Sequence, residues 1–287
     1  MKFSVSSYSF QQFISAKKMT QLDAIRVASE MGFDGIEFTD LRPNDAPTHD
    51  EQLDYAKKIR CEAEKYGIEV VAYLIGADLC KGEDEIRRVM GQVDIAATMG
   101  AKLLRHDVCY SEKKDGRTVG FDALLPSIAD AARRITEYAQ TKGICTMTEN
   151  HGFVAQDSDR LEKLFYAVGH ENYGLLIDFG NFACVDENSI TAVSRLAPYA
   201  FHVHAKDFHI CRFGESEDAM EGKYFLSRGC NKLFGCAIGD GDIPVAQCVA
   251  IMKRAKYEGY LTIEFEGSGD CMQEIARGLK NLRSYES

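Results

Sequence analysis

Residues 62–74 read EAEKYGIEVVAYL and join the end of one structural element to the start of another. An amphipathic segment of helical composition stops at Gly67, and a short run rich in valine, isoleucine and tyrosine follows. Glycine is favoured just after a helix because it readily adopts the positive φ angle needed there. The stretch therefore predicts a helix that leads directly into a β-strand, as in α/β proteins.

The same junction recurs at four further places, which indicates a repeated unit. It is found in ASEMGFDGIEF (28–38), AATMGAKLLRH (96–106), YAQTKGICTMTE (138–149) and RAKYEGYLTIEF (254–265). At these places we expect a glycine to end the helix in the same way: Gly32, Gly100, Gly143 and Gly259. The unit is a helix followed by a buried strand.

Along the whole chain, eight predicted strands alternate with eight predicted helices. The strands are expected at 2–8, 34–38, 68–74, 102–106, 144–149, 174–178, 200–204 and 260–265. The helices are expected at 20–31, 49–66, 83–99, 119–142, 157–168, 188–197, 243–257 and 270–284. The strands are short apolar runs, which is typical of a parallel sheet covered by helices. This alternation favours a closed (β/α)8 TIM barrel over an open doubly wound sheet.

A single domain is expected to span residues 1–287, because no linker rich in proline, glycine or serine divides the chain. The segment 205–242, between the seventh strand and the seventh helix, is too long for an ordinary βα loop. We expect this segment to form a flap over the site or a subunit contact in a homo-oligomer.

Composition limits the function classes. The chain has 34 Lys and Arg against 44 Asp and Glu, a formal net charge of −10, which disfavours a binder of nucleic-acid phosphates. No apolar run approaches the roughly 18 residues of a membrane span, and the N-terminus lacks the features of a signal peptide. The ten cysteines form no CxxC pair, which predicts buried free thiols in a reducing compartment. We therefore expect a cytoplasmic protein that acts on a small molecule.

Polar side chains occur where the predicted strands end, and catalytic groups of TIM barrels collect there. Along the chain these residues are Glu37, His106, Asp107, Glu149, Asn150, His151, Asp178, Asn181, His202, His204, Lys206, Glu264 and Glu266. A single carboxylate at a strand end is usually a helix cap or a solvated loop residue. However, four successive strands end in Glu, Asp, His and Glu, and this joint pattern is difficult to explain in that way.

These four residues, Glu149, Asp178, His204 and Glu264, predict a metal site. Adjacent strands lie about 4.8 Å apart, so inward-pointing side chains at neighbouring strand ends converge. Three carboxylates at such distances repel one another unless protons or a cation intervene. An oxygen-rich set with one imidazole suits Mn²⁺, Mg²⁺ or Co²⁺ better than zinc. We expect one divalent ion, with Mn²⁺ favoured. His202, two residues deeper on the same face as His204, is expected to pack or to form a supporting hydrogen bond.

Five motifs resemble those of a known family: ENHG (149–152), IDFGN (177–181), HVHAKD (202–207), IGDGDIP (238–244) and IEFEG (263–267). In them the chain is similar to the sugar phosphate isomerase/epimerase group of xylose isomerase-like TIM barrels. The resemblance implies the barrel fold and a metal held by the same four residues. It also implies that Glu149 and Glu264 move protons. The chain differs from the ketose 3-epimerases of that group at Asn181, where they place a substrate-binding histidine.

The predicted function is that of a sugar isomerase or epimerase. One glutamate removes a proton from the carbon beside a carbonyl, a metal-stabilised enediolate forms, and the other glutamate returns the proton. The alternative is a lyase or dehydratase of the same barrel family that eliminates a group from a keto-sugar, keto-inositol or oxidised glycoside. DNA-repair endonucleases that share the barrel are disfavoured by the net charge of −10. A non-catalytic sugar-binding barrel stays open as a third class.

Six residues are predicted to contact the substrate: Lys206, His106, His151, Glu37, Asn181 and Tyr8. For Lys206 the alternative is a salt bridge with Asp207 or Glu264. Because the chain has no tryptophan, stacking against a sugar ring would depend on tyrosine or phenylalanine, such as Tyr8 or Phe10.

Overall fold

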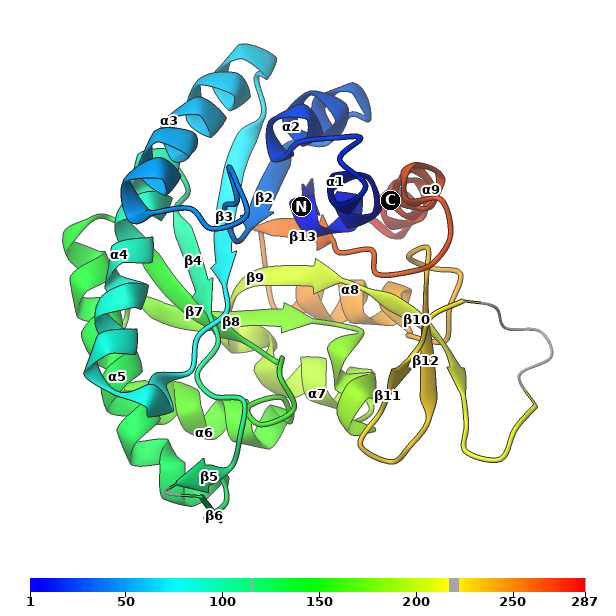
Figure 1. The fold of residues 1–287 in the computed structure, drawn as a ribbon. Helices are drawn as coiled ribbons and strands as arrows, with labels where there is room; N and C mark the ends of the chain where they lie inside the picture. The colour runs from blue at the N-terminus through cyan, green and yellow to red at the C-terminus, as the bar shows by residue number, and fades with distance from the viewer. Residues whose placement is uncertain (115, 217–221, 287) are drawn as a thin grey trace.

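The computed structural model describes residues 1–114, 116–216 and 222–286, and within them eight parallel strands form a closed barrel (Figure 1). The barrel strands are β1 (Lys2–Ser6), β2 (Gly35–Thr39), β3 (Glu69–Ile75), β4 (Leu103–His106), β7 (Cys145–Glu149), β8 (Tyr173–Asp178), β9 (Ala200–Ala205) and β13 (Tyr260–Ile263). They follow one another around the barrel in chain order, and β1 closes the ring by pairing with β13. The predicted TIM barrel is confirmed.

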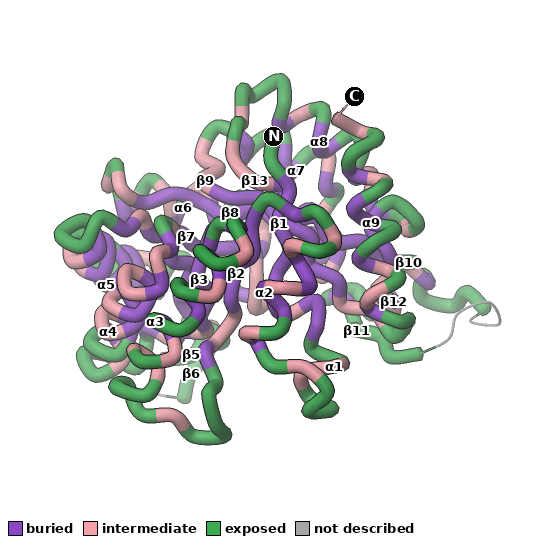
Figure 2. The backbone as a smooth tube through the Cα atoms, turned by 90° about the horizontal axis from the view of Figure 1, so that it is seen from above, coloured by how far each residue is buried: buried purple, intermediate pink, exposed green. Residues whose placement is uncertain are grey.

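Helices cover the outside of the barrel. They are α2 (Gln21–Glu30), α3 (His49–Tyr66), α4 (Glu83–Met99), α5 (Phe121–Thr141), α6 (Ser158–Val168), α7 (Ser189–Leu196), α8 (Val245–Arg254) and α9 (Cys271–Glu286), whereas the short α1 (Gln11–Ser15) lies in the loop after β1. Short 3-10 turns are η1 (Ser7–Phe10), η2 (Leu79–Lys81), η3 (Asn181–Val185) and η4 (Ala197–Tyr199). In Figure 2 the buried residues follow the barrel strands and the inward faces of the helices. None of the helices in the described parts of the chain has the length and apolar character that crossing a membrane requires.

The first strand is shorter than predicted, and α1 was not predicted. β1 stops at Ser6 because the Ser6 hydroxyl accepts a hydrogen bond from the amide of Tyr8 and caps the turn η1. This turn leads directly into α1. As a result, Tyr8 lies in a turn at the C-terminal end of β1 rather than inside the strand.

Four of the predicted helix-ending glycines have the expected positive φ, namely Gly32 (84°), Gly67 (64°), Gly100 (88°) and Gly143 (69°). The prediction was wrong for the fifth glycine, Gly259.

Gly259 does not end α8, because that helix stops at Arg254 and the residue with positive φ is Lys256 (62°). The amide of Tyr257 donates to the carbonyl of Met252 at 3.0 Å and closes the helix there. At position 259 a Cβ atom would lie 2.3 Å from the Tyr257 hydroxyl oxygen, so any other residue there would force the Tyr257 side chain to shift.

The cysteines are all free, as predicted, but they are not all buried. Cys61, Cys80 and Cys230 are exposed. The prediction of buried thiols was therefore wrong for these three residues.

The segment 205–242 forms a small antiparallel sheet that projects from the barrel (Figure 1). Its strands are β10 (Asp207–Cys211), β11 (Phe225–Leu226) and β12 (Lys232–Cys236), and a two-stranded ribbon of β5 (Lys113–Lys114) and β6 (Arg117–Thr118) lies elsewhere on the same chain. Residues 217–221 of the segment lie outside the described residues. Its two predicted uses, as a flap or as a subunit contact, stay predictions.

Asp207 connects this sheet to the loop before α8. Its carboxylate accepts hydrogen bonds from the amides of Gly239, Gly241 and Ile243 at 2.8, 3.0 and 3.1 Å. Replacing Asp207 with alanine leaves these amides without their acceptor in a largely buried place. We expect Asp207→Ala to lower the free energy of unfolding by about 2–4 kcal/mol.

Chemical denaturation of the purified chain measures this effect. The matched control is Asp130→Ala on the exposed side of α5, which should change stability by no more than about 0.5 kcal/mol. Equal stability of the two variants would show that the Asp207 contacts contribute little.

Candidate active site

The structure brings the four predicted metal ligands together at the C-terminal ends of adjacent strands. Glu149 ends β7, Asp178 ends β8, His204 is the next-to-last residue of β9, and Glu264 follows β13. Strand register places Asp178 beside His204, and His204 beside Thr262. One ligand atom from each of the four lies within 4.8 Å of the others, and all four side chains are buried.

The donor set fits a divalent cation. His204 Nδ1 lies 3.8 Å from Glu149 Oε1, 3.8 Å from Asp178 Oδ2 and 3.6 Å from Glu264 Oε2. Both His204 Nδ1 and Asp178 Oδ2 are buried without a hydrogen-bond partner. Buried polar atoms are rarely left unpaired because the cost is high. A cation among these atoms would give each of them a partner.

Without a cation, protons compensate for the crowded carboxylates. Burial raises the pKa of Asp178 to about 6, against the opposing effect of Lys206. Burial by itself would lower the pKa of His204, but the carboxylates of Glu37 and Glu264 raise it well above its usual value. The metal-free site therefore holds a proton on His204 at neutral pH.

We expect metal binding to release protons and to strengthen as the pH rises. A ligand must lose its proton before it binds a metal. Affinity should therefore increase as Asp178 ionises near pH 6 and should continue to increase toward the elevated pKa of His204. Calorimetric titration with Mn²⁺ at about pH 6 and about pH 8, in buffers of different ionisation enthalpy, measures both quantities. The same affinity at both pH values without proton release would contradict this expectation.

Lys206 is buried beside the ligands and is surrounded by acceptors. Its Nζ lies 2.7 Å from Glu264 Oε2 and 3.3 Å from Glu266 Oε2, and it donates to Asn181 Oδ1 at 3.1 Å. Burial would lower the pKa of Lys206, but Asp178 and Glu264 raise it well above its usual value. The predicted pairing with Glu264 is present, whereas the carboxylate of Asp207 faces the loop before α8 instead.

Asn181 and Tyr8 also lie at the site. Asn181 donates from Nδ2 to Glu149 Oε1 at 3.0 Å and so links the carboxylate of Glu149 to the ammonium group of Lys206. The Tyr8 hydroxyl donates to Glu266 Oε1 at 2.6 Å. Burial and the nearby carboxylate of Glu266 raise the pKa of Tyr8, so this hydroxyl keeps its proton.

Arg105 is a site residue that the sequence analysis missed. It is buried in β4, and its Nη2 lies 2.6 Å from Glu149 Oε2. Its Nη1 donates to the carbonyl of Ile75 at 3.2 Å and to Asp107 Oδ2 at 3.4 Å. Arg105 thus orients the second oxygen of the Glu149 carboxylate. Its signal in the sequence is an arginine directly after the two leucines of the strand LLRH, but that signal does not show which way the side chain points.

His106 and His151 occupy different positions near the ends of β4 and β7. His151 is at the rim with a side chain 43% exposed, and its Nδ1 lies 3.0 Å from Asp107 Oδ1. Asp107 also accepts a hydrogen bond from the Tyr110 hydroxyl at 2.7 Å. His106 is fully buried with Nδ1 2.9 Å from the Asp107 carbonyl, and its Nε2 has no partner. Substrate contacts by these histidines stay predictions.

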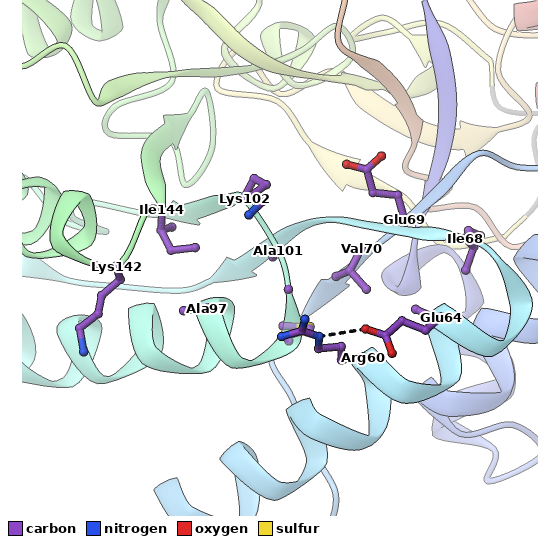
Figure 3. A pocket seen from close by; sticks show the side chains of 14 residues that line it. Arg60, Glu64, Ile68, Glu69, Val70, Ala97, Ala101, Lys102, Lys142 and Ile144 are labelled. Atoms are coloured by element: carbon purple, nitrogen blue, oxygen red, sulfur yellow. Dashed lines mark hydrogen bonds and ion pairs between the residues drawn. The ribbon is translucent and has the colours of Figure 1, made fainter.

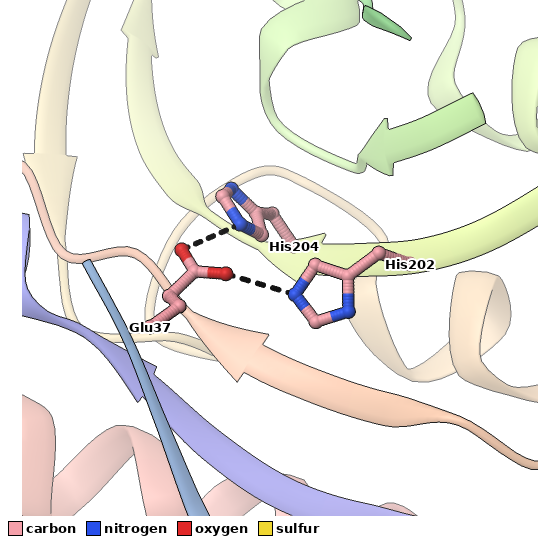
Figure 4. A group of neighbouring side chains, drawn as sticks. All are labelled: Glu37, His202 and His204. Atoms are coloured by element: carbon pink, nitrogen blue, oxygen red, sulfur yellow. Dashed lines mark hydrogen bonds and ion pairs between the residues drawn. The ribbon is translucent and has the colours of Figure 1, made fainter. Parts of the chain in front are cut away.

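Glu37 is not at the end of its strand. It lies in the middle of β2 with no exposed surface, and its carboxylate faces His202 and His204 (Figure 4). This position favours support of the metal ligands over the predicted contact with substrate.

A surface pocket of about 310 Å³ lies at the other end of the barrel. Val70, Lys102 and Ile144, near the N-terminal ends of β3, β4 and β7, are among its lining residues (Figure 3). Because TIM-barrel chemistry takes place at the C-terminal ends of strands, this pocket is not part of the candidate active site.

Comparison with known families agrees with this geometry. The family model described as xylose isomerase-like TIM barrel matches residues 25–285. An inosose dehydratase of Mesomycoplasma hyopneumoniae (strain 7448) is 22% identical over 253 residues, which cover 85% of this chain and 80% of the relative.

Solved structures resemble the whole chain. A structure of the IOLI protein with a bound zinc atom aligns with a TM-score of 0.75 at 16% identity, covering 99% of this chain and 98% of that one. A structure of L-ribulose 3-epimerase aligns with a TM-score of 0.70 at 15% identity, covering 99% and 95%. At these identities the alignments show a shared fold.

Proposed function

Because the chain belongs to the xylose isomerase-like TIM barrel family, we propose that it is a divalent-metal-dependent enzyme acting on a sugar or sugar derivative. Its reaction would move a proton on the carbon beside a carbonyl group, giving isomerisation or epimerisation. The observation that carries this proposal is the buried cluster of Glu149, Asp178, His204 and Glu264. Mn²⁺ is our first choice of ion because three of the four ligands are carboxylates, with Mg²⁺, Co²⁺ and zinc as the ions to compare.

In this proposal the two glutamates, Glu149 and Glu264, act as base and acid. A bound divalent ion would supply Lewis-acid polarisation of the substrate carbonyl. Glu149 and Glu264 come from β7 and from the residue after β13, the two outer positions of the four neighbouring strands that form the cluster. They can therefore approach a bound carbon from different directions, one to remove a proton and one to return it.

Neighbouring side chains keep these two carboxylates in place. Arg105 and Asn181 contact the two oxygens of Glu149, and Lys206 contacts Glu264. The ammonium group of Lys206 faces Glu264, Glu266 and Asn181, so it would have to exchange one of these acceptors to donate to a substrate oxygen that develops negative charge.

An elimination reaction is the second candidate, favoured by the dehydratase relative that covers 85% of the chain. Removal of the same proton followed by loss of a hydroxyl from the next carbon would give a dehydration product. In this alternative His151, which lies at the rim 3.0 Å from Asp107, would supply a proton to the departing hydroxyl.

We propose that the substrate carries no phosphate. The two buried cations of the site are already matched by carboxylates, Arg105 by Glu149 and Lys206 by Glu264 and Glu266. A phosphate group would have to compete with these carboxylates for its positive partners.

Product analysis tests the proposed function. The Mn²⁺-loaded chain is incubated with free sugars, sugar phosphates, 3-keto sugars and a keto-inositol, and the products are identified by NMR and mass spectrometry. A product of unchanged mass supports isomerisation or epimerisation, whereas loss of one water supports the dehydratase alternative. Absence of turnover on every member of the panel would count against a sugar-processing enzyme.

A further inference from the structure

A buried carboxylate joins two histidines inside the barrel. Glu37 Oε1 lies 2.8 Å from His204 Nε2, and Glu37 Oε2 lies 2.8 Å from His202 Nε2 (Figure 4). Glu37 belongs to β2 and the histidines to β9, and these strands are separated around the barrel by β1 and β13. The carboxylate therefore reaches across the barrel interior to its partners.

The contacts continue beyond His202 to two further strands. The Thr262 hydroxyl of β13 lies 2.9 Å from His202 Nε2, and the hydroxyls of Thr262 and Ser4 are hydrogen-bonded to each other. All of these side chains are buried. A buried network of polar side chains holds these side chains in one arrangement, because each of them depends on its neighbours for a hydrogen-bond partner.

The contacts determine which nitrogen of His204 can bind a metal. An ionised carboxylate only accepts hydrogen bonds, so each Nε2 that faces Glu37 carries a hydrogen. The Glu37 carboxylate is buried between the two imidazoles, with one oxygen 2.8 Å from each Nε2, and this geometry pairs each oxygen with a ring N–H. His204 therefore directs Nδ1 toward Glu149, Asp178 and Glu264.

We propose that Glu37 is a positioning residue that sets the metal affinity of the site. One oxygen of its carboxylate holds His204 through Nε2, and His202 holds the other oxygen in place. This inference rests on the proposed function, since it assumes that the cluster around His204 binds a divalent ion. Glu37 itself would contact neither metal nor substrate.

A second metal ion held by Glu37, His202 and His204 is the competing explanation, since their ligand atoms lie within 4.8 Å of one another. Two ligands of a tetrahedral ion, each about 2.1 Å from it, would lie about 3.4 Å apart. The observed oxygen-to-nitrogen distances of 2.8 Å are shorter: Glu37 Oε2 is hydrogen-bonded to His202 Nε2, and Glu37 Oε1 is in direct ion-pair contact with His204 Nε2. The geometry thus favours direct contacts over a bridging ion.

Glu37→Gln is the informative substitution. The amide has nearly the same shape, but only one of its two ends accepts a hydrogen bond, so it cannot serve both Nε2–H groups. Loss of a partner that orients a metal-bound histidine typically weakens metal binding about 10- to 100-fold. We expect that loss of affinity, with kcat close to that of the unchanged chain once the metal is saturating.

Competition with a fluorescent chelator measures Mn²⁺ affinity of the unchanged chain, of Glu37→Gln and of the control Thr39→Val. Thr39 lies on the same strand, and its buried hydroxyl has no hydrogen-bond partner, so its loss should leave affinity unchanged. Imidazole ¹⁵N NMR of the Mg²⁺-loaded chain gives a second readout, in which His204 should carry its hydrogen on Nε2. Thermal melts without metal show whether each variant is folded.

The outcomes separate the inference from the proposed function. Weaker binding by Glu37→Gln alone supports the inference, whereas unchanged binding by that variant overturns it and leaves the proposed function standing. Failure of the unchanged chain to bind any divalent ion would overturn the proposed function instead. If Glu37→Gln does not fold, His202→Asn decides, because it removes the partner of the second Glu37 oxygen. Weaker binding than in the unchanged chain supports the inference, and unchanged binding overturns it.

Discussion

Glu149→Gln and Glu264→Gln are each expected to lower kcat by at least about 10²- to 10⁴-fold, the contribution of a well-placed acid or base. Each substitution removes a group that can take or return the substrate proton. Each also removes a charged oxygen from the metal site, so the combined loss should lie at the upper end of this range or beyond it. Steady-state rates on the substrate found in the product screen measure the effect.

The metal dependence of these variants distinguishes the two contributions. If the rate loss persists at saturating Mn²⁺, the missing base is its cause; if added metal restores the rate, loss of the ligand is the cause. Glu258→Gln is the matched control, because Glu258 is exposed and precedes β13 without contacting the cluster. Full turnover by either active-site variant would refute the two-glutamate mechanism.

Removal of the metal is expected to abolish turnover and to destabilise the chain. The cluster places three carboxylates and a histidine in a buried space, and binding of a cation stabilises only the folded arrangement. At a free metal concentration of about 100 times Kd, the stabilisation should be about 2.7 kcal/mol. Thermal melts with chelator and with added Mn²⁺ measure it as a shift in Tm.

Asp178→Asn gives the matched control for this experiment. The substituted amide would keep the shape of the Asp178 side chain but lose its charge, so the metal-dependent shift in Tm should become much smaller. Equal Tm and equal activity with and without chelator in the unchanged chain would show that no metal takes part.

The alternation of helices and strands could be predicted because it depends on local patterns. Helices α3 and α4 begin and end at the predicted residues, since capping residues and αL glycines such as Gly67 and Gly100 mark them in the sequence. The end of α8 was missed because Lys256 adopts positive φ, which a non-glycine residue does rarely and without a sequence signal.

The four-residue cluster was also predictable, because strand ends in a barrel meet at one rim. The contacts that each charged side chain forms could not be predicted from the sequence. Lys206 could pair with Asp207 or with Glu264, and only the fold shows that Asp207 turns to the amides before α8. Contacts that cross the barrel, such as Glu37 to His204, join residues 167 positions apart and leave no local pattern (204 − 37 = 167).

Arg105 illustrates a further limit. A charged residue inside an apolar strand can face a helix, the solvent or the barrel interior, and the sequence does not distinguish these places. The structure shows that Arg105 faces inward and contacts Glu149 on the next strand of the barrel, which would make it part of the proposed acid–base machinery.

Deuterium incorporation tests the central claim most directly. The Mn²⁺-loaded chain is incubated in D₂O with the sugar or keto-sugar that it turns over, and the recovered substrate and product are examined by NMR. The account predicts deuterium at one carbon beside the carbonyl, no incorporation after chelation, and none in whichever of Glu149→Gln and Glu264→Gln lacks the glutamate that removes the proton. Turnover without any deuterium at that carbon would contradict proton transfer by solvent-exchangeable glutamates.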